Sequence, residues 1–210
     1  MQYCIAFLAF MGLVAAFYAE MLRVEVDAKG TCNAVFDGRD MRCAVGKGGA
    51  AAPGAKVEGD GKTPVGVFPL RRGFYRKDRV SAPVSDFSLY ATTESDGWCD
   101  DSMSSLYNQP ITIPETRCSS AENLWRTDGL YDLVAVVEYN TDPVKPGKGS
   151  AIFLHVASGS FSPTAGCVAL SLEDLEFVLA NHVDAIEIAT KEDATFAPGT
   201  QRWVFNTTAA

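Results

Sequence analysis

The sequence predicts a mainly β (α+β) fold with one helix near the C-terminal end of the domain. Short apolar segments rich in β-branched and aromatic residues recur along the chain, and glycine and proline separate them. Only the segment after Cys167 repeats apolar residues at helical spacing. The 210 residues, 47% hydrophobic and 21% charged, suffice for one globular core. The net charge of −8 and the lack of a basic run argue against a nucleic-acid binder.

Residues 1–19 predict a secretory signal peptide, and residues 20–210 a single domain. The first charged side chain is Glu20, and the apolar run before it has the length of a signal-peptide core. A retained membrane anchor is the alternative, although the run is short for a bilayer span. We therefore expect a secreted or periplasmic monomer that does not span the membrane once the signal is removed.

The cysteines predict two disulfides and one free thiol. Signal removal takes Cys4 and leaves an odd number in an exported protein, where cysteines that can meet are oxidised. The sequence does not fix the pairing, but the shortest loops join Cys32 to Cys43 and Cys99 to Cys118. That choice leaves Cys167 free. The alternative is that all of these cysteines are reduced structural residues.

The N-terminal half of the domain reads as strands joined by ordered loops. Residues 21–46 alternate apolar and polar side chains around an Asp37-Gly38 turn, which predicts a β-hairpin. Residues 46–66 hold too many glycines and prolines for a helix and lead into a strand at Val67 to Leu70. The polar, turn-rich stretch from Tyr75 to Arg126 has the composition of binding loops or of solvated surface.

The C-terminal half supplies two strands, the helix and a closing strand. Residues 129–140 and 151–156 are rich in β-branched and aromatic residues, and the second segment lacks polar alternation, which predicts burial on both faces. Ser171, followed three residues later by Asp174, predicts the N-cap of a helix that ends near Ala180. Residues 184–189 alternate apolar and polar side chains, which predicts a closing strand.

The segment from His155 to Cys167 carries the strongest chemical signal. An imidazole at the end of a buried strand loses hydration, so His155 either finds partners in the core or faces a cleft. Gly166 permits a tight turn before the thiol, and the following helix N-terminus favours a thiolate. Cys167 is thus a candidate nucleophile with His155 as its base, and the backbone amides of the turn are candidates for an oxyanion site. The scattered carboxylates and the lack of a CxxC motif predict no metal and no cofactor.

These residues resemble a known family. The segment "IFLHVASGSFSPTAGCVALS" is similar to the catalytic motif of the L,D-transpeptidase (YkuD-like) family, and "RCAVGKGG", "EGDGKTPVGVFPLRRGFYRKDRV", "GWCDD", "YNQP", "LW", "DGLYDLVAVVEYN" and "GKGSAIFLHV" extend the resemblance over most of the chain. The resemblance implies a β-sandwich catalytic domain that acts on peptidoglycan stem peptides. It also implies a thioester on the nucleophile, which a second stem peptide resolves to a cross-link or water hydrolyses.

Carried over residue by residue, Cys167 matches the nucleophile and His155 the base, beside the turn formed by Thr164, Ala165 and Gly166. For substrate contact the candidates, each of which could instead pack or cap, are Trp98, Asp100, Tyr107, Asn108 and Tyr131.

The sequence departs from the family pattern around the thiol. Many members carry His before the glycine and Arg or Asn shortly after the cysteine, whereas this chain has Ala165, Val168 and Ala169. Because those polar groups shape the acceptor site in the better-known branch, an L,D-carboxypeptidase or other thiol amide hydrolase of the same fold is the alternative. A non-catalytic wall-binding module stapled by disulfides is a third interpretation.

Overall fold

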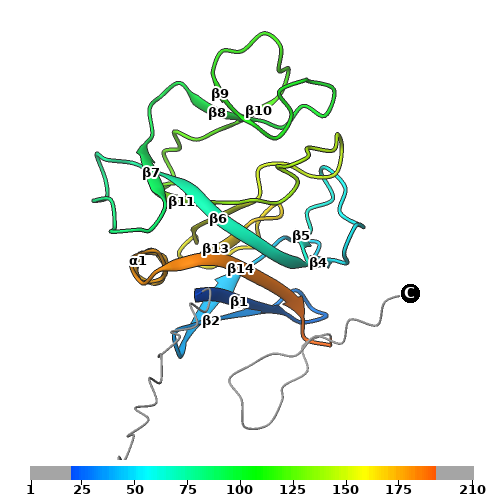
Figure 1. Ribbon diagram of the computed structural model, residues 1–210. Helices are drawn as coiled ribbons and strands as arrows, with labels where there is room; N and C mark the ends of the chain where they lie inside the picture. Colours follow the sequence, from blue (N-terminus) through cyan, green and yellow to red (C-terminus); the bar gives the residue numbers. More distant parts are fainter. Residues whose placement is uncertain (1–19, 193–210) are drawn as a thin grey trace, which may run out of the picture.

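A computed structural model of the protein describes residues 20–192, and the predicted signal peptide lies outside this range (Figure 1). The strands and the helix of the described residues are β1 (Glu20–Val26), β2 (Cys32–Phe36), β3 (Arg39–Ala44), β4 (Ala50–Ala51), β5 (Thr63–Pro64), β6 (Gly66–Tyr75), β7 (Ser88–Ala91), β8 (Asp96–Cys99), β9 (Pro110–Thr112), β10 (Ala121–Asn123), β11 (Leu133–Val137), β12 (Phe153–Val156), β13 (Val168–Leu170), α1 (Leu172–Ala180) and β14 (Val183–Thr190). The prediction of a mainly β fold with a helix after Cys167 is confirmed.

The main sheet closes on itself. Its strand order is β11-β12-β13-β3-β2-β1-β14-β6-β7, and β6 also pairs with β11. The first and last strands of the described chain lie side by side, because β1 and β14 run parallel over their length. The predicted hairpin is present as β2 and β3, joined at Asp37 and Gly38, both of which have positive φ as such turns require.

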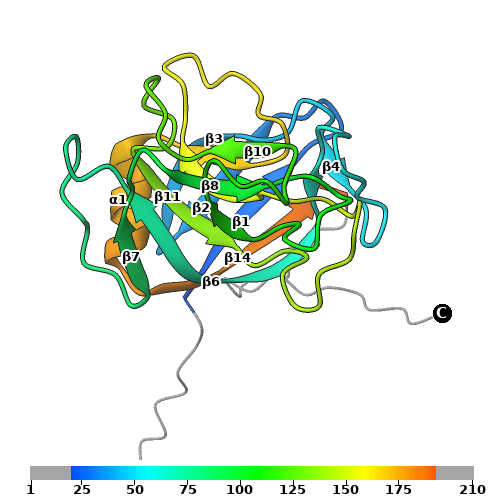
Figure 2. The same ribbon diagram turned by 90° about the horizontal axis from the view of Figure 1, so that it is seen from above.

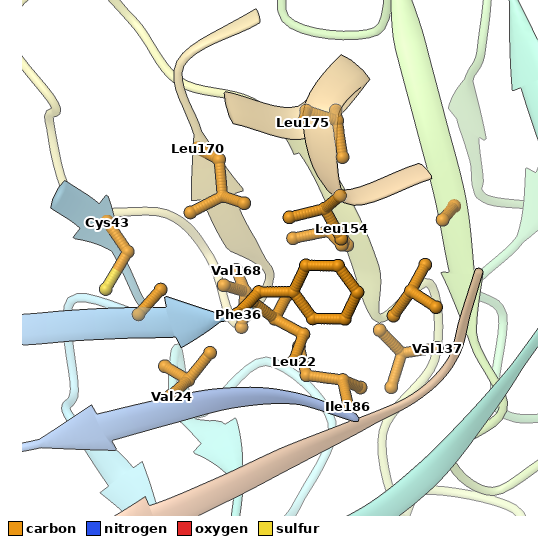
Figure 3. Close-up of a cluster of buried hydrophobic side chains, with 14 of the residues drawn as sticks. Leu22, Val24, Phe36, Cys43, Val137, Leu154, Val168, Leu170, Leu175 and Ile186 are labelled. Carbon is orange, nitrogen blue, oxygen red and sulfur yellow. The ribbon is translucent and has the colours of Figure 1, made fainter. Parts of the chain in front are cut away.

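The larger core fills the space enclosed by the main sheet and α1. Figure 3 shows Phe36 surrounded by Leu22, Val168 and Leu154 from separate strands, with Leu175 of α1 nearby. The helix begins where the sequence predicts, because the Ser171 side chain accepts a hydrogen bond from the Asp174 amide. Leu175, Val178 and Leu179 bury the inner face of α1 in this core.

A second, smaller core lies on the other face of β11 and β12. Along β11 the side chains of Leu133, Ala135 and Val137 enter the larger core, whereas Val134 and Val136 enter the smaller one. Because both faces are covered, β11 is apolar without alternation. On β12, for which the sequence predicted burial on both faces, Leu154 enters the larger core and Phe153 the smaller one. The edge of the Trp98 ring packs on Phe153, with ring centroids 5.2 Å apart.

A three-stranded sheet, β10-β8-β9, covers this smaller core. In Figure 1 it forms the green layer at the top, and in Figure 2, seen from above, β8 and β10 lie over β11. The Cys99–Cys118 disulfide ties β8 to the loop before β10, and Cys32–Cys43 joins β2 to β3. These are the short-loop pairs, and among the described cysteines Cys167 is free. The polar stretch after Tyr75 therefore contains a folded layer rather than loops alone.

The predicted closing strand is present as β14, an inner strand between β1 and β6. Ile186 and Ile188 enter the larger core, and Glu187 between them is also buried, on the other face of the strand. Glu187 forms an ion pair with Arg23 of β1, whose Nε lies 3.1 Å from Glu187 Oε2. Across the residues that the structure describes, no helix is long and apolar enough to span a membrane.

Candidate active site

A cavity of about 470 Å³ opens beside the C-terminal end of β12 and the turn before β13. It brings together Cys167, His155 and the turn residues Thr164, Ala165 and Gly166, which are spread over 13 positions of the sequence. Strands β12 and β13 are parallel neighbours, with His155 opposite Ala169, so Cys167 lies two positions before the partner of His155 and on the same face of the sheet. Local pairing alone therefore explains why the histidine and the cysteine share one cavity.

The Cys167 thiol is held by the backbone of the segment that leads into β12. Its Sγ donates to the Ala151 carbonyl at 3.3 Å and accepts from the Phe153 amide at 3.4 Å. Only 7% of the residue is exposed. Burial, opposed in part by the Phe153 hydrogen bond, raises the pKa of the Cys167 thiol to about 12. In the free protein the Cys167 thiol is thus protonated near pH 7.

His155 is fixed in one tautomer. Its Nδ1 lies 2.8 Å from the Val156 carbonyl, which only accepts, so Nδ1 carries the proton and Nε2 is left as an acceptor. Burial lowers the pKa of His155 to about 4, and the hydrogen bond to Val156 opposes this shift only partly. The imidazole is therefore neutral near pH 7, as a base must be. Within residues 20–192 no hydrogen bond joins His155 to Cys167, and catalytic contacts of this kind often tighten only with substrate bound.

The turn before the thiol is built on Thr164. Its Oγ1 donates to the Cys167 carbonyl at 2.7 Å and accepts from the Gly166 amide at 3.1 Å. Its backbone binds the segment after β3, through Lys47 N to Thr164 O at 2.9 Å. Gly166 has φ of +146°, and a Cβ there would lie 3.0 Å from the Lys62 carbonyl oxygen. Only glycine fits that close approach without displacing the neighbouring loop.

Of the predicted substrate contacts, the structure places Asp100 and Tyr131 on the cavity. Asp100 Oδ1 is buried, and in the described part of the chain it has no hydrogen-bond partner. Tyr131 is only 7% exposed, and its ring lies edge-on to His155, with centroids 5.3 Å apart. Both therefore reach the space beside His155 and Cys167, Asp100 from the position directly after β8 and Tyr131 from the segment before β11.

The other three candidates lie behind the cavity wall. Trp98, Tyr107 and Asn108 are buried and do not line the cavity. Asn108 accepts from Trp98 Nε1 at 2.9 Å and from the Ala151 amide at 3.0 Å, and the Tyr107 hydroxyl accepts from the Gly149 amide at 3.0 Å. These side chains pack and cap the segment that holds Cys167, which is the alternative that the sequence left open.

The sequence did not single out several charged residues that line the cavity: Lys47, Lys56, Glu58, Glu122 and Arg126. Glu58 accepts from the hydroxyls of Tyr107 and Ser150, and Lys56 pairs with Asp60 at 2.6 Å. Glu122 and Arg126 flank the "LW" motif at a spacing of four residues, which is the one signal that could have drawn attention to them. Among residues 20–192 no group of His, Cys, Asp or Glu side chains is arranged to hold a metal ion.

Comparison with known proteins places the chain in a family. The family model described as "YkuD: L,D-transpeptidase catalytic domain" matches residues 23–196. No protein with a curated description matches. Two solved structures are similar to the chain: the helical cell shape determining protein Pgp2 from Campylobacter jejuni, at 16% identity and a TM-score of 0.38, and L,D-transpeptidase 1 from Mycobacterium tuberculosis, at 12% identity and a TM-score of 0.33.

Each comparison covers 81% of this chain, but only 48% of the Campylobacter chain and 62% of the Mycobacterium chain. The chain therefore spans less than two thirds of the length of either. The family model matches a range that includes β2 to β14 and all of the cavity residues described above. On that match, the chain belongs to the YkuD family of L,D-transpeptidase catalytic domains.

Proposed function

We propose that the protein is a cysteine-dependent L,D-transpeptidase that acts on peptidoglycan stem peptides through a thioester acyl-enzyme. The observation that carries this proposal is the meeting of a free thiol, a neutral imidazole and a glycine turn in one cavity of a YkuD family domain. Cys167 is the nucleophile and His155 the general base. The disulfides are typical of oxidising compartments, which supports action in the cell envelope, outside the cytoplasm.

The resting state explains how the reaction starts. A thiol with a raised pKa and a histidine with a lowered one stay neutral, so the thiolate forms only when substrate draws the groups together. His155 Nε2 then takes the thiol proton as Sγ attacks the carbonyl carbon of the third residue of the stem peptide. The Thr164 and Gly166 amides already donate to the Val45 carbonyl and to Thr164 Oγ1, so the Ala165 and Cys167 amides of the turn stabilise the oxyanion.

Collapse of this intermediate breaks the peptide bond. The imidazolium returns its proton to the departing nitrogen, D-alanine leaves, and the acyl group stays on Cys167 as a thioester. In the second half the amine of another stem peptide attacks the thioester, giving up a proton to His155, and the thiol is regenerated with a cross-linked product. The proton count is the same at the end as at the start.

Hydrolysis is a second candidate, favoured by the environment of the positions after the thiol. Val168 and Ala169 are buried in β13, and Ala165 on the cavity has no polar group, so these positions cannot bind an acceptor peptide through polar side chains. Water needs no such site. An L,D-carboxypeptidase would use the same acylation and release the tripeptide.

Asp100 is the substrate contact that we propose with the most support. A buried carboxylate oxygen without a hydrogen-bond partner is costly, and a donor group on the substrate would satisfy it. We propose Tyr131 as the neighbouring wall of the same substrate pocket.

The test is product analysis by mass spectrometry, with purified tetrapeptide and pentapeptide muropeptides as substrates. Loss of D-alanine with a higher-mass dimer indicates transpeptidation, and loss without dimers indicates the hydrolase. Cys167→Ala should abolish both products, and His155→Gln should reduce them strongly. Full activity of Cys167→Ala would refute the proposed function. If the wild-type protein binds the muropeptides but leaves them intact, the result would favour a wall-binding module.

A further inference from the structure

A salt bridge lies on the cavity wall next to the reactive pair. Arg126 Nη1 is 3.0 Å from Glu122 Oε1, and both residues line the cavity with Cys167 and His155. Glu122 belongs to β10, opposite Trp98 of β8, and Arg126 follows in the loop after β10. The pair is therefore part of the three-stranded layer that covers the smaller core.

Arg126 is anchored from two sides. Its Nη2 donates to Asp128 at 2.5 Å, and its backbone carbonyl accepts from Arg76 Nη1 at 2.6 Å. Arg76 in turn stacks over the Trp125 ring at 3.5 Å. A guanidinium held by this many partners is a fixed charge rather than a mobile surface side chain.

Tyr131 connects the ion pair to the histidine. Its hydroxyl donates to Glu122 Oε1 at 3.2 Å, and the Arg126 guanidinium lies 5.0 Å from the ring centroid. The same ring packs edge-on against the His155 imidazole, at 5.3 Å and an interplanar angle of 70°. Fixing the phenol therefore restricts the orientation of the imidazole, whose Nδ1 is held by the Val156 carbonyl.

The two charges act on the thiol in opposite directions. The Glu122 carboxylate opposes a thiolate at Cys167, and Arg126 favours one, as does Lys56. The remaining ionisable groups on the cavity around the thiol are Glu58, Asp100, Tyr131 and His155, with Lys47 at the loop after β3. The Arg126 cation also disfavours protonation of His155. A lone carboxylate at Glu122 would hold Tyr131 equally well but would work against the nucleophile.

We propose that Glu122 and Arg126 are positioning residues of the active site: Glu122 holds the Tyr131 ring against His155, and Arg126 balances the Glu122 charge beside Cys167. The inference rests on the proposed function only in naming His155 and Cys167 the reacting groups. It assigns no substrate contact to either residue.

The test measures the rate at which iodoacetamide alkylates Cys167 over a pH series below the thiol pKa. Because only the thiolate reacts, Glu122→Gln should raise the rate and Arg126→Gln should lower it, each by about threefold or more. The double variant, Glu122→Gln with Arg126→Gln, should return close to the wild-type rate. A purely structural role would instead loosen the site in both single variants, moving both rates the same way and adding their effects in the double variant.

Glu115 and Arg117 supply the matched control. They form an ion pair of similar length, 2.8 Å, in the same layer but off the cavity. Glu115→Gln and Arg117→Gln should leave alkylation unchanged. The inference is overturned if the alkylation rate of Cys167 changes in the same direction in Glu122→Gln and Arg126→Gln. It is also overturned if their rates change no more than those of the control variants. Alkylation needs no peptide, so opposite shifts in a protein that turns over no muropeptide would refute the proposed function and leave the charge balance standing.

Discussion

Asn108 is a site where one substitution should have a large and calculable effect. Its side chain is buried and makes four hydrogen bonds: Oδ1 accepts from Trp98 Nε1 and the Ala151 amide, and Nδ2 donates to the carbonyls of Tyr139 and Asn140. Its backbone has φ of +56°, a region that Asn tolerates better than Ala. Asn108→Ala removes all four contacts and keeps the strained backbone.

The magnitude follows from counting what is left unpaired. Two buried donors, Trp98 Nε1 and the Ala151 amide, lose their acceptor, at a cost of about 1–3 kcal/mol each. The carbonyls lose less, because each has a second lone pair. Ala in the left-handed region adds about 1 kcal/mol. We therefore expect Asn108→Ala to lower the free energy of unfolding by about 4 kcal/mol, a large part of the usual total.

Urea unfolding followed by tryptophan fluorescence measures this loss, and two further variants divide it. Asn108→Gly removes the same contacts but relieves the backbone, so it should be about 1 kcal/mol more stable than Asn108→Ala. Asn108→Asp keeps the acceptor for Trp98 and Ala151. Because Ala151 also holds the thiol, alkylation of Cys167 should change in the Ala variant as well. A loss in Asn108→Ala of less than about 1 kcal/mol would refute the hydrogen-bond account of this site.

Three other predictions concern the same framework. Between pH 6.5 and about 4 the unfolded chain binds a proton at His155 that the native protein does not, so lowering the pH through this window should lower the free energy of unfolding by up to about 3 kcal/mol. Urea titrations of His155→Gln should lack this part of the loss, and identical pH slopes in the variant and the wild type would contradict the prediction. Gly166→Ala should lower the free energy of unfolding by about 1–3 kcal/mol, because position 166 has a positive φ and its Cβ would lie close to the Lys62 carbonyl. The control is Gly159→Ala on the same loop, where a Cβ meets nothing within 4 Å and no loss is expected. Equal melting temperatures of the two variants would refute the close-approach argument. Replacing Cys99 and Cys118 together by Ser should lower the free energy of unfolding by about 3 kcal/mol, because the disulfide closes a loop whose ends are 19 residues apart. An unchanged denaturation midpoint would show that the layer over the smaller core does not depend on this bond.

Local sequence patterns predicted those parts of the fold that depend on interactions between residues close in the sequence. The Ser171 cap, the Asp37-Gly38 turn and the apolar run of β12 follow from hydrogen bonds and packing between near neighbours, and the structure contains each of them. The pairing of β1 with β14 joins segments more than 150 residues apart, and nothing in either segment specifies its partner. The same pairing sets Arg23 opposite Glu187, which provides the buried carboxylate with its ion pair.

The residues of the candidate site also fall into two groups, those close together in the sequence and those brought together only by the fold. His155, Gly166 and Cys167 lie in one short segment, where strand, turn and helix signals coincide, so the sequence could indicate them together. Asp100, Glu122 and Arg126 reach the cavity only because the three-stranded layer folds over β11 and β12. Asn108 and Trp98 looked like polar and aromatic binding residues, but their hydrogen bonds are turned inward, toward each other and toward Ala151. Composition alone cannot distinguish such a buried network from a binding loop.

The most direct test of the central claim is intact-protein mass spectrometry of residues 20–210 after rapid quenching with a tetrapeptide muropeptide, followed by peptide mapping. The account predicts an added mass equal to the acyl tripeptide portion, attached to Cys167 and lost on treatment with hydroxylamine, as a thioester requires. Cys167→Ser or Cys167→Ala should carry no hydroxylamine-sensitive adduct. An adduct on another residue, or release of D-alanine by Cys167→Ala at the wild-type rate, would contradict the account.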